Sequence, residues 1–404
     1  MEIIKKRQTL LFCNDIATKD LIAIIQGGEI TLDEFIQANL DQGKIVDIQN
    51  VIKSTEDERK KEDEMTKKKN QKTDVVKDIL RGRTGADKIQ EQINAKSFSF
   101  DDLLDEGLSL KTVNSLKHYC STNRIRKPKT LDQLPPMQDG RTDVYFVGVA
   151  GSGKSTMLAG LLKTAHMNGI LLPDPKSNNE GSLYQTELIQ DLNKGVLPKS
   201  TQIGSYNYIA LSLQDENGKN HPFNIVDVPG ENYTNIFENA EVESLLKYIG
   251  NNNKKILIFV VDSLAHNEGY ISESQNQLDQ SLAYVNILQM FQSNGVLEQT
   301  DAVYFIVNKY DEIKEIKYPH DERPKGDHAL EYMTEEFLSL LENCKSIRKS
   351  SNNKFKIKVM PFSIGSIAHK YILTSFDKEF TSTLIKQLLK DSFVIRGGAP
   401  QVFK

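Results

Sequence analysis

A glycine-rich turn between an apolar stretch and a helix-like stretch constrains this chain more than any other feature. Residues 143–156 read DVYFVGVAGSGKST, so the apolar run ends at Gly148 and a helical pattern begins around Lys154. The segment matches G-x-x-x-x-G-K-[ST], with the strand before and the helix after that this pattern requires. Glycines let backbone N–H groups converge on phosphate oxygens, and a helix N-terminus adds partial positive charge. The stretch therefore predicts a site for nucleotide phosphates.

The side chains of this loop predict distinct roles. Lys154 supplies a positive charge for the β- and γ-phosphates, and the Ser155 hydroxyl suits Mg²⁺. The alternative is a chance glycine-rich turn, and the flanking strand and helix argue against it. The other loop residues expected to contact the nucleotide are Gly148, Gly151, Ser152, Gly153 and Thr156.

Composition narrows the class of protein. The 404 residues allow two or three domains, and a net charge of −4 gives no general attraction to nucleic acid or anionic membranes. Cys13, Cys120 and Cys344 lie far apart in no metal-binding spacing, so we expect reduced thiols in a cytoplasmic protein. The most apolar run, residues 256–261, is too short to span a bilayer, and the N-terminus lacks a signal-peptide pattern.

Residues 1–132 are expected to be mostly helical, with a connector at 133–142. Within this region, Thr31 to Glu34 fits a capping box at the start of a helix. The pattern around residues 21–35 recurs weakly around 89–103, which indicates either two related helical hairpins or a chance repetition of common helix starts. The highly charged segment 54–73 holds one apolar residue, so it is either a solvated helix or a flexible linker.

From residue 143 to 404, apolar strand-like runs alternate with helical patterns. Such alternation predicts an α/β fold, a mainly parallel sheet with helices on both faces. Ligands of such sheets bind at the carboxyl ends of the strands. The predicted strands are residues 144–147, 206–213, 223–226, 255–261, 302–307 and 356–361, and the predicted helices follow the glycine-rich loop and lie at about 243–248, 277–291, 330–341 and 383–389.

Two motifs follow predicted strands of this region. Asp227 begins the D-x-x-G sequence that ends at Gly230, and an Asp at this place can hold Mg²⁺ through water while the glycine N–H approaches a γ-phosphate. An ordinary strand-end turn is the alternative. The second motif, N-K-x-D, comprises Asn308, Lys309 and Asp311.

The second motif predicts the base. The Asp311 carboxylate can accept two hydrogen bonds from the N1–H and N2–H edge of guanine, a pair of donors that adenine lacks. Asn308 is expected to satisfy the O6/N7 side and Lys309 to cover the base with its stem. Ser363, after a later strand, could offer a backbone N–H to guanine O6. The alternative is an ordinary loop that makes no contact with the base.

With these motifs in order, residues from about 141 to 392 resemble a Ras-like P-loop GTPase domain of the translation-factor-related class. The long segment 169–195 resembles the extended region of some bacterial GTPases, including double-GTPase-type proteins, and predicts an extended switch I region at about 169–200. The resemblance also implies a switch I threonine that binds Mg²⁺ and senses the γ-phosphate. Thr201 is the predicted residue, and Ser200 is the alternative.

One residue departs from the Ras-like pattern. Glu231 follows Gly230 where those enzymes place a glutamine that orients the attacking water. A glutamate could accept a hydrogen bond from water or act as a base, but its charge would be repelled by phosphate, and it could equally face solvent. His221 and His266 lack a supporting constellation, and His221 is expected to serve packing or the surface.

The sequence therefore predicts a GTP- and GDP-binding switch that uses Mg²⁺ and hydrolyses GTP slowly or with help from a protein partner. Lys154, Thr201, Gly230 and Glu231 are the predicted catalytic residues, and Ser155, Thr201 and Asp227 the predicted metal residues. The alternatives are a non-hydrolysing GTP-binding interaction module whose N-terminal helices recruit a partner, and an ATP-using kinase or ATPase, which would leave the N-K-x-D motif without purpose.

Overall fold

A computed structural model describes residues 2–122, 130–199, 206–230, 241–264 and 280–392. By compactness the chain divides into two units, Met1–Arg81 and Gly82–Lys404. No helix among the described residues combines the length and the apolar composition that crossing a bilayer requires. All three cysteines are free.

The first unit is helical. Its helices are α1 (Glu2–Leu11), α2 (Thr18–Gln26), α3 (Leu32–Gln37) and α4 (Gln42–Leu80), with a short 3-10 turn at Cys13–Asp15. The predicted capping box is present, because the Thr31 side chain accepts from the Glu34 N–H and Glu34 accepts from the Thr31 N–H. A small core gathers around Phe35, Leu21 and Ile48.

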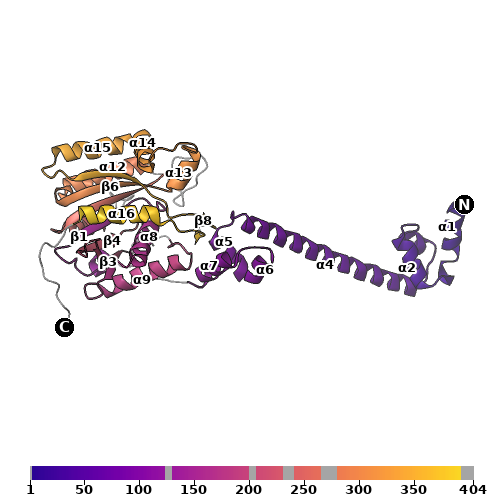
Figure 1. The fold of residues 1–404 in the computed structure, drawn as a ribbon. Helices are drawn as coiled ribbons and strands as arrows, with labels where there is room; N and C mark the ends of the chain where they lie inside the picture. The colour runs from indigo at the N-terminus through magenta and orange to yellow at the C-terminus, as the bar shows by residue number, and fades with distance from the viewer. Residues whose placement is uncertain (1, 123–129, 200–205, 231–240, 265–279, 393–404) are drawn as a thin grey trace. The chain divides into compact units, whose positions relative to one another are not determined.

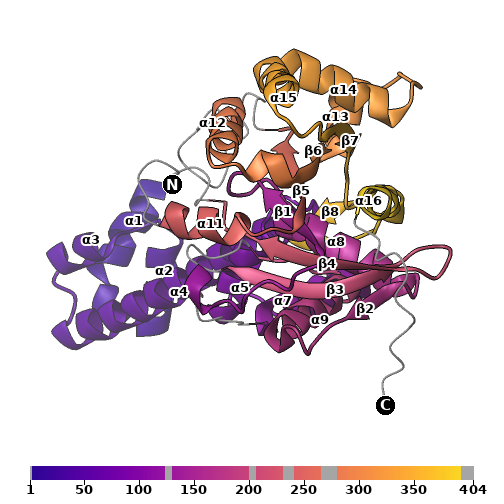
Figure 2. The same cartoon turned by 90° about the vertical axis from the view of Figure 1, so that its left-hand side faces the viewer.

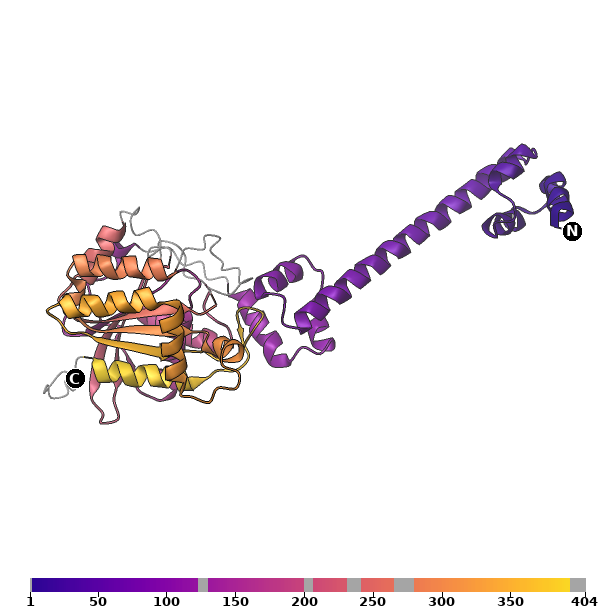
Figure 3. The same cartoon turned by 90° about the horizontal axis from the view of Figure 1, so that it is seen from above.

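The charged segment 54–73 lies within α4. This helix runs for 39 residues, so the helical alternative of the sequence analysis is the one observed. Figure 3 shows the helix as one unbroken element. Segment 54–73 holds one apolar residue, Met65, so burial of an apolar face contributes little to this part of the helix.

The second unit begins with three helices, α5 (Ala86–Asn94), α6 (Phe100–Asp105) and α7 (Leu110–Ser121). As in the first unit, a helix of nine residues precedes a six-residue helix that starts with a capping box, here between Ser99 and Asp102. A 3-10 turn at Leu131–Gln133 leads into the sheet.

A seven-stranded sheet forms the centre of the second unit. Its order is β2-β3-β4-β1-β5-β6-β7. Pairing is parallel from β4 through β7 and antiparallel between β2, β3 and β4. The strands are β1 (Thr142–Val147), β2 (Leu171–Pro173), β3 (Asn207–Gln214), β4 (Asn220–Asp227), β5 (Lys254–Asp262), β6 (Thr300–Asn308) and β7 (Lys356–Pro361).

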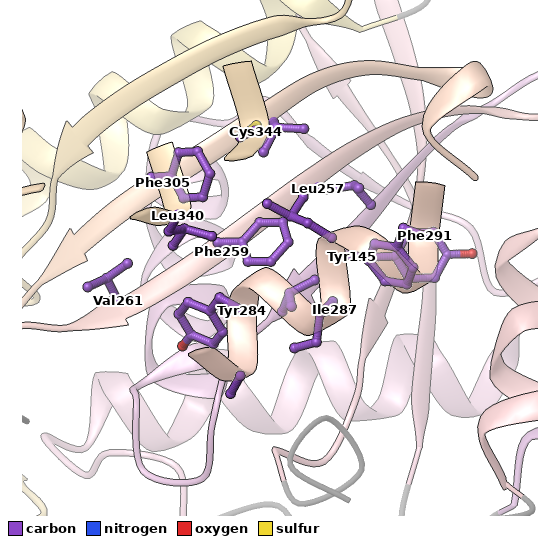
Figure 4. Close-up of a cluster of buried hydrophobic side chains, with 14 of the residues drawn as sticks. Tyr145, Leu257, Phe259, Val261, Tyr284, Ile287, Phe291, Phe305, Leu340 and Cys344 are labelled. Atoms are coloured by element: carbon purple, nitrogen blue, oxygen red, sulfur yellow. The ribbon is translucent and has the colours of Figure 1, made fainter. Parts of the chain in front are cut away.

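Helices cover both faces of this sheet, as predicted (Figures 1 and 2). Because the central strands are buried on both sides, they are almost continuously apolar. On one face Phe259, Tyr284 and Phe305 pack together (Figure 4). That face carries α11 (Glu241–Ile249), α12 (Gln280–Ser293), α14 (Lys325–Glu336) and α15 (Leu338–Ser350), and the other carries α8 (Lys154–Met167), α9 (Asn179–Asn193) and α16 (Lys378–Asp391).

Several elements differ from the sequence predictions. The single helix expected at 330–341 is two helices, because the Phe337 backbone (φ −129°, ψ 31°) leaves helical geometry between α14 and α15. The sequence analysis named no element between residues 169 and 195, yet β2 and α9 lie there. The short helix α13 (Tyr310–Ile316) and the small hairpin β8 (Ile367–Ala368) and β9 (Ile372–Leu373) were also not predicted.

A buried polar cluster lies where β1 and β5 begin. The register pairs Asp143 with Lys255, and both are fully buried. Asp143 accepts hydrogen bonds from Asn224, Asn251 and Asn253, and burial nevertheless raises its pKa. Lys255 Nζ donates to the carbonyl oxygens of Asn251 and Asn253, at 2.7 and 2.6 Å, and burial lowers its pKa to about 8.

This depressed pKa predicts a pH dependence of stability. Between pH 8 and about 10.4, the unfolded Lys255 holds a proton that the folded residue has released, so the free energy of unfolding should rise with pH by up to about 1.4 kcal/mol per unit. Lys255→Met lacks this contribution. Urea unfolding at pH 8, 9 and 10 should therefore show the wild type gaining stability relative to the variant. Parallel pH profiles for the two proteins would contradict the burial argument.

Candidate nucleotide site

The loop between β1 and α8 has the backbone geometry of a phosphate cradle. Gly151 and Gly153 have φ of 75° and 93°, a region that favours glycine. A Cβ built on Gly153 would overlap Asn308 Nδ2, so any larger residue would displace that side chain. Ser152 is buried and Thr156 half-buried beside them. Glycine is therefore favoured in this loop both by the positive φ of Gly151 and Gly153 and by the close approach of Asn308 to Gly153.

The loop is supported from below by Tyr284 of α12. Its hydroxyl donates to the Val260 carbonyl at 2.6 Å and lies 3.3 Å from the Val149 nitrogen, whose N–H it accepts. Burial raises the pKa of this phenol. A Cβ on Gly148 would approach Ser152 Oγ to 2.6 Å and the Tyr284 hydroxyl to 3.2 Å, which explains the glycine directly after β1.

Lys154 is held inside the loop at the start of α8. Its Nζ donates to the Gly148 carbonyl at 2.8 Å and to the Val149 carbonyl at 3.1 Å, and the residue is only 6% exposed. These bonds fix the ammonium group where the loop N–H groups and the helix N-terminus converge. The arrangement concentrates positive potential at one point, as phosphate binding requires.

Three hydroxyl or carboxylate side chains meet next to the loop. Ser155 Oγ donates to Asp227 Oδ2 at 3.0 Å, which joins the start of α8 to the end of β4. Tyr184 of α9 donates to the same oxygen at 2.8 Å. A hydroxyl beside a carboxylate is a hard-oxygen donor set that fits Mg²⁺. Among the described residues no group of three or more His, Cys, Asp or Glu could hold a metal.

The N-K-x-D motif lies beside the loop, because β6 runs parallel to β5 and β5 to β1. Asn308 Nδ2 donates to the Ser152 carbonyl at 2.7 Å, and both residues are buried. Lys309 has φ 56° and its Nζ lies 2.9 Å from Asp262 Oδ2 at the end of β5. Asp311 is exposed in the first turn of α13.

Tyr310, the variable residue of the motif, anchors it to the protein interior. Its N–H donates to the Phe362 carbonyl at 3.0 Å, and its hydroxyl lies 2.8 Å from His328 Nδ1. Burial raises the pKa of Tyr310. His328 Nε2 lies 3.2 Å from Asp321, and the Arg323 hydrogen bonds hold the pKa of that carboxyl below its usual value. The Phe362 contact also brings Ser363, which is buried, next to the motif.

The structure brings most of the predicted residues together, but not all can be located. Thr201, its alternative Ser200, Glu231 and His266 lie outside the described residues. Gly230 is described and packs so closely that a Cβ would overlap the Ala150 nitrogen. This contact places the D-x-x-G turn directly against the phosphate loop.

His221 lies at the other end of β4. Its ring contacts Ser392 Oγ at 2.7 Å and Asp215 Oδ2 at 3.3 Å, and it is 3% exposed. These are packing contacts in the buried end of the strand, in agreement with the role expected from the sequence.

Three site residues escaped the sequence analysis: Tyr184, Asp262 and Tyr284. Tyr184, Leu188 and Leu192 recur at four-residue spacing, a helical signal in a segment for which only an extended switch I region was predicted. Asp262 follows the most apolar strand of the chain, the same kind of position that singled out Asp227. Tyr284 belongs to no sequence motif. Only the tertiary structure shows that α12 brings its hydroxyl to the Val149 nitrogen of the loop.

Comparison with known proteins identifies the family. The model of the family Double-GTPase 1 matches residues 145–360, slightly more than half of the chain, and this match includes all three motifs. The chain belongs to the Double-GTPase 1 family. Membership supports a GTP-binding protein, in agreement with the guanine prediction from Asn308 and Asp311.

Other comparisons are more distant. No curated protein matches the sequence. The crystal structure of sup35 complexed with GDP is similar at 13% identity and a TM-score of 0.26, over 64% of this chain and 49% of that one. The chain thus spans about half the length of that solved structure.

The contact between Gly153 and Asn308 predicts the effect of a single methyl group. Gly153→Ala should lower the affinity for a fluorescent GDP analogue at least about tenfold, because the left-handed backbone costs about 1–2 kcal/mol and the new Cβ displaces Asn308. Gly326→Ala is the matched control, since a Cβ there meets nothing within 4 Å. Equal affinity in the two variants would show that this contact does not shape the site.

Proposed function

We propose that this chain binds GTP and GDP with Mg²⁺ and hydrolyses GTP, so that it acts as a nucleotide-dependent switch. The observation that carries the proposal is the hydrogen bond from Asn308 Nδ2 to the Ser152 carbonyl. This bond joins the predicted base-recognition motif to the predicted phosphate loop in one buried unit. A P-loop used for another nucleotide would not need this pairing.

The residues have separable roles in this proposal. Lys154 and the loop N–H groups bind the β- and γ-phosphates, and Gly230 offers its N–H to the γ-phosphate from beside Ala150. Ser155 and Asp227 would hold Mg²⁺, which when bound neutralises developing phosphate charge. Asp311 accepts from guanine, Lys309 covers the base, and the Ser363 segment approaches O6. Thr201 remains the proposed Mg²⁺ ligand of switch I. Glu231 remains the proposed residue that contacts the attacking water.

The proposal also covers the cellular compartment of the protein and the region that binds a partner. The three free thiols suit a reducing compartment such as the cytoplasm. The helical region of residues 1–132 is the proposed partner-binding part, attached to the GTPase domain of 143–404 through the connector at 133–142. Helix α7 contacts Lys194, next to the proposed switch I, and the segment around Tyr371 and Thr374 that follows Ser363, which gives nucleotide state a physical route to this helix.

Base recognition gives a direct test. Asp311→Asn should weaken GTP binding at least about tenfold and improve binding of xanthosine triphosphate, because the amide donates where the carboxylate accepted. Asp327→Asn, an exposed residue of α14, is the control. Competition against a fluorescent GDP analogue measures both nucleotides. Equal affinity of the wild type for GTP and ATP would overturn the guanine assignment.

Hydrolysis is tested separately from binding. We expect slow phosphate release by the wild type, faster release with cell extract, and none by Lys154→Ala. The second candidate, a non-hydrolysing interaction module, is favoured by Glu231 in place of the usual glutamine. Under that candidate, wild type and Glu231→Ala would both bind GTP and release no phosphate, with or without extract.

A further inference from the structure

Helix α9 packs into the core of the second unit. It lies next to Ser155 and Asp227, the pair of residues proposed to hold Mg²⁺ and called the metal-binding corner below. It is capped by Asn178, whose Oδ1 accepts the Gly181 N–H at 3.0 Å. Leu188 and Leu192 pack in the same buried cluster as Leu158 and Leu161 of α8. A Cβ on Gly181 would overlap the Tyr208 carbonyl, so α9 lies in close contact with β3, as Figure 2 shows. The helix is therefore held by its contacts with both α8 and β3.

This packing directs one polar group of α9 toward the site. Tyr184 is 8% exposed and Asp227 is 1% exposed. The Tyr184 hydroxyl and the Ser155 hydroxyl donate to the same oxygen, Asp227 Oδ2, at 2.8 and 3.0 Å. Hydrogen bonds to a carboxylate in a water-poor site are strong and directional, so two donors on one oxygen fix the plane of the carboxylate.

We propose that Tyr184 is a positioning residue for Mg²⁺: its hydroxyl orients the Asp227 carboxylate and so makes α9 part of the metal-binding corner. The inference rests on the proposed function, because it assigns Mg²⁺ to Ser155 and Asp227. Groups that hold a ligating carboxylate in place typically change metal affinity tenfold or more when they are removed. In this role the hydroxyl acts through its hydrogen bond to Asp227 and is not itself a metal ligand.

The test separates metal positioning from ordinary packing. Purified full-length protein is loaded with a fluorescent GDP analogue, and nucleotide release is followed at a series of buffered free Mg²⁺ concentrations. Tyr184→Phe should need about tenfold more Mg²⁺ for half-maximal retention, while release in excess EDTA stays equal to the wild type. The control is Tyr208→Phe, which removes another buried hydroxyl, bonded to Asn224 at 2.9 Å, and should titrate like the wild type.

The outcomes are distinguishable. Normal Mg²⁺-dependent binding with an unchanged Tyr184→Phe midpoint, or equal shifts in Tyr184→Phe and Tyr208→Phe, would overturn the positioning role alone. A wild type that retains no guanine nucleotide at any Mg²⁺ concentration would overturn the proposed function and this inference with it. Thermal unfolding verifies that each variant is folded, and Tyr184→Met, also without a donor, replaces Tyr184→Phe if that variant does not fold.

Discussion

The hydrogen bond between Asn308 Nδ2 and the Ser152 carbonyl is the interaction on which the site depends. It is buried, so an unmade bond would leave an amide and a carbonyl without water to replace it. The bond requires Gly153 to lack a side chain, because any Cβ there would occupy the position of the amide. The glycine-rich loop and the N-K-x-D motif, joined here by residues 156 positions apart in the sequence, are thereby held as one structure.

Parallel strand pairing makes that bond possible. Since β4, β1, β5 and β6 run side by side in the same direction, their carboxyl ends bring Asp227, Gly148, Asp262 and Asn308 to one edge of the sheet. At the opposite edge, the same register buries Asp143 against Lys255. There the buried carboxylate accepts from asparagine side chains and the buried ammonium donates to a backbone carbonyl, whereas the strand centres are apolar.

The elements outside the minimal motifs connect the site to the rest of the second unit. Helix α9 contacts Asp227 through Tyr184, and its C-terminal end contacts α7, where His118 Nε2 lies 3.1 Å from Asp191. Helix α7 also reaches the β8–β9 hairpin, through the stacking of Tyr119 on Tyr371. These helices therefore touch segments adjacent to both the proposed Mg²⁺ site at Ser155 and Asp227 and the proposed base-recognition loops.

The sequence by itself determined the α/β class, the six longer strands and the places of the glycine-rich loop and the N-K-x-D segment at strand ends, because each is a local pattern. It did not determine α9, α13 or the break at Phe337, where packing decides the backbone. Nor could it show that Tyr184 and Ser155 share one oxygen of Asp227, or that Asn308 bonds to Ser152. Those contacts join residues distant in sequence, and only tertiary structure decides which distant residues share a buried space.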